Sequence, residues 1–157
     1  MMRHAILWAG LALGLSAVPA AAQCRAPANA QALVNEMAGQ LNATRTASGL
    51  PALRYNRQLS EAAMTHACDM VRHGFFAHRG TDGTNSHQRV LRAGFNSCLT
   101  AENLSWGYDQ SSQIVGGWLQ SAGHRRNMLN GDAREFGIGV IDSPRGPYTV
   151  LVVSKRC

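Results

Sequence analysis

The stretch that decides the fold is Phe136-Gly-Ile-Gly-Val-Ile141, in which small and apolar residues alternate. A second run, Tyr148 to Ser154, is rich in β-branched residues, and residues 142–147 between the two runs include Gly and Pro. Two such runs joined by a turn segment predict an antiparallel hairpin. We expect a third strand near Leu99 to Leu104 or near Ala52 to Tyr55.

Four segments that precede the hairpin carry apolar residues at helical spacing. Gly49 and Gly74 follow the first two of them, and glycine commonly ends a helix. Ser111 is the expected N-cap of the fourth. Helices first and antiparallel strands last predict an α+β domain with helices packed on a small sheet. The four predicted helices are residues 28–48, 58–73, 85–93 and 111–121.

The N-terminus has the three-part layout of a secretory signal peptide. Arg3 precedes an uncharged apolar run from Ala5 to Val18, and Pro19 is followed by three alanines that provide a small-residue cleavage site. This run is too short to span a bilayer, and no other segment is long and apolar enough to do so. We therefore expect residues 1–22 to be removed, leaving residues 23–157 as a single domain that is secreted or periplasmic.

All four cysteines lie in the expected mature chain. An even number of cysteines in an exported chain favours two disulfides, with three possible pairings. A zinc cluster is the competing interpretation, but the sequence has no C-x-x-C spacing. We expect Cys24 to pair with Cys157, which would tie the two ends together, and Cys68 to pair with Cys98.

The formal net charge is +6 at pH 7, and loss of Arg3 lowers it by one. The cationic residues are scattered along the chain, and the tightest groups are Arg125-Arg126 and Lys155-Arg156. Groups of two are too small for a nucleic-acid footprint. We therefore expect no nucleic-acid partner, and we expect the mature chain to be a monomer.

Two histidines and one glutamate lie in three segments rich in Gly, Asn, Ser and aromatic residues: His78 in F-F-A-H, Glu102 in A-E-N-L-S-W-G and His124 in W-L-Q-S-A-G-H-R-R-N-M-L. Two imidazoles and a carboxylate, if the fold brings them together, can bind a divalent metal or hold an activated water. Ser121 with His124 and Glu102 would make a hydrolytic triad, but Ser121 lacks the G-x-S-x-G setting of such a nucleophile. Asn127 is close enough to His124 in sequence to contact a ligand.

Five phrases of the sequence, in this order, resemble the superfamily of cysteine-rich secretory proteins, antigen 5 and pathogenesis-related 1 proteins (CAP or SCP), and in particular its compact bacterial branch. The resemblance covers residues 31–153. The phrases are L-P-A-L-R-Y-N-R-Q-L-S-E-A-A-M, F-F-A-H, A-E-N-L-S-W-G, W-L-Q-S-A-G-H-R-R-N-M-L and F-G-I-G-V.

The resemblance implies an α-β-α sandwich with a small three-stranded antiparallel sheet between helical layers. It also implies a cleft with two histidines and two acidic residues, which in some members bind Zn²⁺ or another divalent metal. His78, Glu102 and His124 fall on three of these positions, with the two histidines as metal ligands. Ser121 stands on the fourth, where animal and plant members have a second glutamate, and this puts a two-carboxylate mechanism in doubt.

Three functional hypotheses follow. In the first, the chain is a binding module for an apolar or envelope-derived ligand, such as a lipid or another cell-envelope component. In the second, it is a metal-assisted hydrolase of peptides, with His78, Glu102 and His124 as candidate catalytic residues. In the third, it acts through its exposed loops. The expected ligand cleft comprises His78, Glu102, Ser121, His124 and Asn127.

Overall fold

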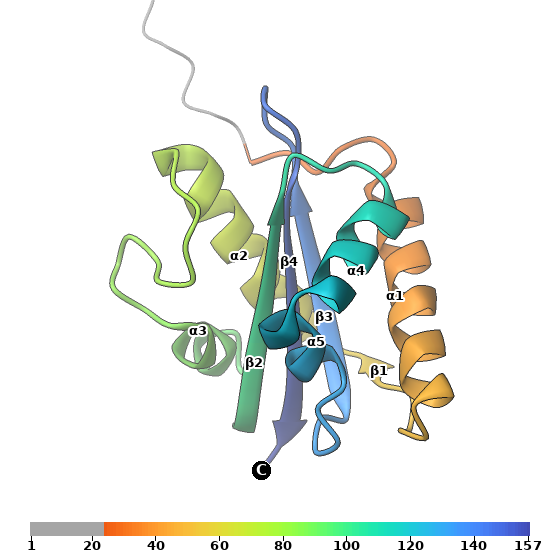
Figure 1. Ribbon diagram of the computed structural model, residues 1–157. Helices are drawn as coiled ribbons and strands as arrows, with labels where there is room; N and C mark the ends of the chain where they lie inside the picture. The colour runs from red at the N-terminus through yellow and green to blue at the C-terminus, as the bar shows by residue number, and fades with distance from the viewer. Residues whose placement is uncertain (1–23) are drawn as a thin grey trace, which may run out of the picture.

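The computed structural model describes residues 24–157, so the predicted signal peptide lies outside the described residues. One sheet lies between two layers of helices (Figure 1). One apolar core fills the space between the sheet and α1, α4 and α5, and a second fills the space between the sheet and α2 and α3. The helices are α1 (Ala30–Ala47), α2 (Arg57–His73), α3 (Ser86–Arg92), α4 (Ser111–Gln120) and α5 (Ala122–Met128).

The sheet has four strands in the order β1-β3-β4-β2. Strands β2 and β3 both pair with β4 in antiparallel fashion, whereas the two-residue β1 pairs with β3 in parallel. The expected three-stranded antiparallel sheet was therefore wrong in strand number and in direction, because both candidate segments for a third strand joined the sheet. The strands are β1 (Arg54–Tyr55), β2 (Ser97–Trp106), β3 (Glu135–Ile141) and β4 (Tyr148–Arg156).

The two glycines of β3 bring helix α2 into direct contact with the sheet. A Cβ atom on Gly137 would lie 2.1 Å from the amide nitrogen of Ser60, and one on Gly139 would lie 2.4 Å from that of Met64. No side chain fits at either position. The apolar residues that alternate with these glycines face the other core, and this is the physical reason for the F-G-I-G-V pattern.

Capping residues set the ends of the helices that flank the site. The Asn56 side chain accepts hydrogen bonds from two main-chain amides at the start of α2, and Gly74 ends α2 in the left-handed conformation (φ 66°). Asn85 and Gln88 form a capping box at the start of α3. The N-cap of α4 is Gln110 and not Ser111, whose hydroxyl donates to Glu36 on α1. The loop between α2 and α3 is therefore fixed at both ends.

The expected disulfide pairing was wrong: Cys24 is bonded to Cys68, and Cys98 is bonded to Cys157. The Cys24 and Cys157 positions lie at opposite ends of the sheet. The main-chain carbonyl of Arg25 accepts a hydrogen bond from the amide of Asp142, which follows the last residue of β3. This contact places Cys24 at that end of the sheet. The antiparallel register of β2 with β4 brings Cys157 beside Cys98.

Among residues 24–157, no helix has the length and apolar character needed to cross a membrane.

Candidate functional site

Glu102, on strand β2, lies at the centre of the site, and its side chain is only 3% exposed. One carboxylate oxygen accepts a hydrogen bond from Nδ1 of His78 at 2.9 Å, and the other accepts from Nη2 of Arg89 at 2.7 Å. The sequence prediction that His78 and Glu102 converge agrees with this geometry. Because both oxygens have protein partners and the side chain is almost fully buried, Glu102 serves to orient the imidazole of His78.

Arg89, on α3, makes the burial of this carboxylate possible. Its side chain is 7% exposed, and its guanidinium donates hydrogen bonds to the carbonyls of Thr84 and His78 in addition to Glu102. A buried charge is strongly destabilising without such a partner. Sequence reasoning missed this residue, since an arginine on a short helix is more commonly solvated. No neighbouring residue in the sequence indicates that Arg89 is buried.

His78 presents one ring nitrogen to solvent. A carboxylate can only accept, so Nδ1 of the neutral ring carries the proton and Nε2 keeps its lone pair. The hydrogen bond to Glu102 raises the pKa of His78, against a smaller effect of burial. The side chain is 61% exposed. The result is an oriented imidazole with a free Nε2 at the protein surface.

His66, on α2, supports the loop that carries His78. It is fully buried, and its Nε2 donates to the carbonyl of Ala77 at 2.9 Å, one residue before His78. Burial lowers the pKa of His66 and favours the neutral ring. The helical spacing of His66 with the apolar residues Ala62 and Met70 is the sequence signal that could have identified it as inward-facing.

His124 projects from α5, which is tied to β2 by two asparagines. Asn103 donates to the carbonyl of His124 at 3.0 Å, while Asn127 donates to the carbonyl of Glu102 and to the side chain of Asn103. Burial and, secondarily, the charge of His78 lower the pKa of His124. Both imidazoles thus lie on segments that contact the same strand, β2.

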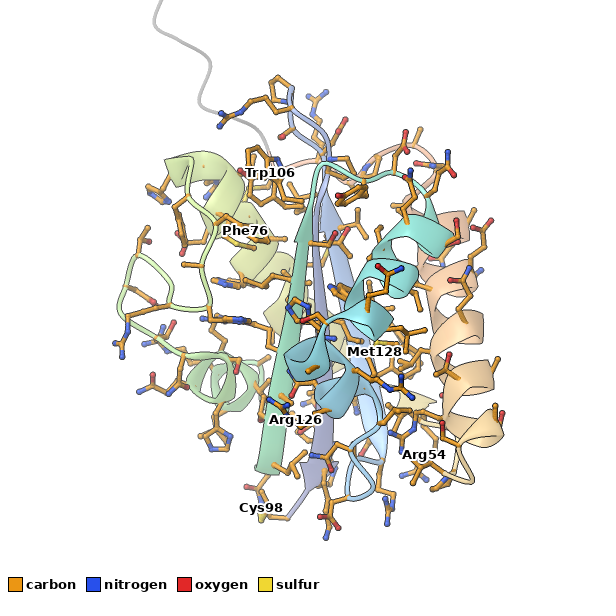
Figure 2. The ribbon with its side chains drawn as sticks, viewed as in Figure 1. Arg54, Phe76, Cys98, Trp106, Arg126 and Met128 are labelled. Atoms are coloured by element: carbon orange, nitrogen blue, oxygen red, sulfur yellow. A yellow bond between two sulfur atoms is a disulfide. The ribbon has the colours of Figure 1, made fainter. Side chains whose placement is uncertain are left out.

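An apolar groove with a cavity of about 610 Å³ adjoins His124 between β2 and α4. Phe76 and Trp106 lie close together beside β2 (Figure 2), with ring centroids 6.3 Å apart. Phe76 is 46% exposed and Tyr108 is 51% exposed. Ser121 and His124 supply polar groups among the lining residues, which otherwise include Phe76, Leu104, Trp106, Tyr108, Ile114 and Trp118.

A metal bound here would have two histidine nitrogens as protein ligands, Nε2 of His78 and a ring nitrogen of His124. The Glu102 carboxylate is directed at His78 and Arg89, and its side chain is only 3% exposed. Within residues 24–157, no group of three or more His, Cys, Asp or Glu side chains is arranged to hold a metal ion. Water would have to complete the coordination sphere, whereas catalytic zinc sites usually have three protein ligands.

Ser121 lies at the junction of α4 and α5, where its main chain is engaged at both ends. Its amide donates to the carbonyl of Trp118, and its carbonyl accepts from Arg125. Among the described residues, its hydroxyl makes no hydrogen bond to an imidazole. The side chain thus lines the groove without the nucleophile–base contact that a serine hydrolase needs.

An α-β-α sandwich in which a glutamate of the sheet holds an exposed histidine near a second histidine defines an SCP-type domain. The sequence model of the cysteine-rich secretory protein family, CAP, matches residues 38–154. The chain belongs to the CAP family.

Known proteins similar to this chain include bacterial extracellular and surface proteins. The uncharacterised protein YkwD of Bacillus subtilis is 27% identical over 118 residues, which are 75% of this chain and 46% of YkwD. An extracellular protein containing an SCP domain from Bacillus anthracis is 25% identical with a TM-score of 0.75, over 80% of this chain and 41% of that one. The chain thus spans less than half the length of either.

An outer surface protein from Borrelia burgdorferi has the same fold, with a TM-score of 0.79. It is 20% identical to this chain, and the match covers 86% of this chain and 100% of the Borrelia chain.

Proposed function

We propose that this chain is an exported binding module that takes an apolar ligand, of lipid or other cell-envelope origin, in the groove between β2 and α4. The observation that carries the proposal is the groove itself, a cavity of about 610 Å³ in which the aromatic rings of Phe76, Trp106 and Tyr108 lie among polar side chains. Phe76 and Tyr108 are about half exposed there. Contiguous exposed apolar surface is a mark of a binding site, and a pocket of this size suits a small amphiphile.

The polar residues of the groove suggest how an amphiphile would be oriented. Ser121 and His124 contribute polar atoms at one side of the lining, and Ser105, Ser112, Gln113 and Gln120 contribute the others. A ligand with a hydroxyl or carboxyl head would place that head against them and its hydrocarbon along Trp106. Two disulfides and the extracellular relatives support export.

Titration with two fluorescent probes, a polyene fatty acid and a polyene sterol, tests this proposal. Phe76→Ala/Trp106→Ala should weaken probe binding by about tenfold or more, equivalent to about 1.4 kcal/mol. Tyr55→Ala is the matched control, because Tyr55 is a 58% exposed aromatic residue outside the groove. Absence of saturable binding by the folded wild type, or an equal loss in the control, would refute the groove as the site.

We infer reversible binding of a divalent metal, such as Zn²⁺, as a second function of the same cleft. The specific observation is that Glu102 binds Nδ1 of His78, which leaves the lone pair on Nε2, and that Asn103 and Asn127 hold the helix of His124 against the same strand. Calorimetric titration with zinc should show one-to-one binding that is lost in His78→Ala/His124→Ala. His73→Ala/His87→Ala removes two histidines elsewhere and should leave the binding intact. Equal binding by both double mutants would contradict the inference.

The alternative of a metal-assisted peptidase would use the same histidines, with an imidazole as the base that activates water. The hydroxyl of Ser121 makes no contact with an imidazole among residues 24–157, so a serine nucleophile is the less favoured route. A zinc-dependent release of fluorophore from a quenched peptide library, abolished in His78→Ala/His124→Ala, would restore this alternative.

A further inference from the structure

A separate feature of the fold is the distribution of charge over its surface. Cationic residues are scattered along the sequence, but seven exposed ones lie on segments that meet at one end of the sandwich. Figure 2 shows Arg54 and Arg126 towards this end, which also has Cys98, whereas Trp106 lies at the opposite end. We call this surface the basic end, and its cations are Arg54, Arg57, Arg125, Arg126, Arg134, Lys155 and Arg156.

Strand pairing gathers cations that are far apart in the sequence. The amide of Arg54, on β1, donates to the carbonyl of Arg134, whose own amide donates to the carbonyl of Ser154 on β4. Strand β4 ends with the basic residues 155–156, and Arg57 begins α2 two residues after the end of β1. The folded chain therefore has a basic surface for which the sequence contains no continuous run of charge.

Few acidic groups offset the charge of the basic end. Asp132 is exposed there, Glu61 lies one turn along α2 from Arg57, and Glu135 is 8% exposed. Among residues 24–157, the contact of 3.9 Å between Glu135 and Arg156 is the only ion pair that a cation of this end makes. Elsewhere on the described surface, cations and acids are equal in number: Arg25, Arg72, Arg79, Arg92 and Arg145 against Glu36, Asp69, Asp82, Asp109 and Asp142.

Arg45 adds a buried positive charge beneath the basic end. Its guanidinium donates to three main-chain carbonyls and, within residues 24–157, to no carboxylate. Burial and, secondarily, the charge of Arg134 lower the pKa of Arg45. Because the buried Arg89 and Glu102 neutralise each other, the net positive charge that remains without the signal peptide resides at the basic end. A free carboxylate at Cys157 would lower this charge by one.

We propose that the basic end docks on a lipid surface that is rich in anionic phosphate headgroups. The cations are spread over the ends of two strands, the start of α2 and helix α5, so a single phosphate could contact only a few of them. A surface with repeated negative charges can contact most of them together. Each Lys or Arg that lies close to an anionic bilayer strengthens binding about fivefold.

Tyr55 favours a lipid surface over a soluble anionic polymer. Its ring is 58% exposed beside Arg54, and the edge of the ring packs on Phe136 with centroids 6.0 Å apart. Tyrosine rings are enriched at the headgroup level of membranes, where one part of the ring contacts apolar groups and the hydroxyl remains solvated. A polyanion in solution offers no such apolar layer. The docking surface is independent of the ligand proposed for the groove beside β2.

Co-sedimentation of the oxidised mature protein with vesicles tests the proposal. The protein should bind vesicles of phosphatidylcholine with about one-third phosphatidylglycerol and should not bind vesicles of phosphatidylcholine alone. Raising the salt concentration from about 0.1 M to about 0.5 M should weaken binding at least tenfold, because salt screens exposed charges. Absence of binding to the anionic vesicles by the folded wild type at the lower salt concentration would overturn the proposal.

Arg54→Gln/Arg57→Gln/Lys155→Gln should lower the vesicle partition coefficient by about a hundredfold. Arg25→Gln/Arg72→Gln/Arg145→Gln is the matched control, because it has the same net charge but retains the basic end, and it should bind nearly as wild type does. Circular dichroism establishes that both variants are folded. An equal loss of binding in the two variants would show an effect of net charge alone and would overturn the proposal.

Two further measurements separate docking from the other possible interactions. Phe76→Ala/Trp106→Ala should bind anionic vesicles as wild type does, and loss of vesicle binding in this variant would assign the interaction to the groove and overturn docking through the basic end. Long-chain inorganic polyphosphate is the soluble polyanion for comparison. Binding of polyphosphate without any binding of anionic vesicles would also overturn the proposal, in favour of a polymer as the partner.

Discussion

Replacing Gly137 by alanine is the most direct test of how the sheet and helix α2 fit together. The added Cβ would lie 2.1 Å from the Ser60 amide nitrogen, 2.3 Å from the Leu59 carbonyl carbon and 2.7 Å from the Leu59 Cβ. Overpacking a core typically costs about 1–3 kcal/mol. Two of the three contacts are with helix main chain, which cannot move aside by a rotamer change, so we expect a loss of about 3 kcal/mol or more.

Gly39→Ala provides the matched control because this glycine lies on α1, and a Cβ atom added to it would have nothing within 4 Å. An alanine there should stabilise the protein by up to about 1 kcal/mol through helix propensity. Equilibrium urea unfolding with both disulfides intact measures both changes. A Gly137→Ala protein that loses less than about 1 kcal/mol, the lower end of the cost of overpacking, would refute direct main-chain contact between α2 and β3.

Two further predictions concern the site and the disulfides. Glu102→Gln should lower the pKa of His78 towards its ordinary value of about 6.5, measured by NMR in metal-free buffer, and an unchanged pKa would contradict the hydrogen bond. Because folding raises this pKa, the stabilisation from protonated His78 is full below about pH 6.5 and is lost as the pH rises through the folded value. The side chain is 61% exposed, so this effect on unfolding is small. Cys98→Ser/Cys157→Ser should cost up to about 4 kcal/mol, the chain-entropy value for a separation of 59 residues. Non-reducing peptide mapping that joined Cys24 to Cys157 would contradict the observed pairing.

The regular parts of the fold were readable from the sequence because their patterns are local. The glycine alternation of β3 and the helical spacing in α1 and α2 each reflect one buried face. Helix α5 was missed because Met128 is its only fully buried residue, so it has no apolar stripe. Strand β1 has two residues, and its direction depends on β3, which lies far along the chain. The disulfide pairing depends on the register of β2 with β4, which composition does not encode.

In the candidate site, His78, Glu102 and His124 were predicted, but the group that permits their arrangement was not. Arg89 neutralises the buried carboxylate, and its role depends on α3 packing against β2. His66 has a structural role, because its hydrogen bond to Ala77 crosses to a loop whose path cannot be read from the sequence. The candidate ligand-binding residues could be recognised from sequence motifs. The residues that position them could be recognised only from the folded structure.

Glu102 connects two parts of the chain that do not otherwise depend on each other. Its side chain holds His78, and its main-chain carbonyl is held by Asn127 on α5, the helix that carries His124. A single residue of an edge strand thus couples the position of His78 to that of the helix carrying His124. Insertions in the α2–α3 loop or before α4 would reshape the surface around Glu102 while both contacts stayed the same, so new ligand preferences can arise without rebuilding the support of either imidazole.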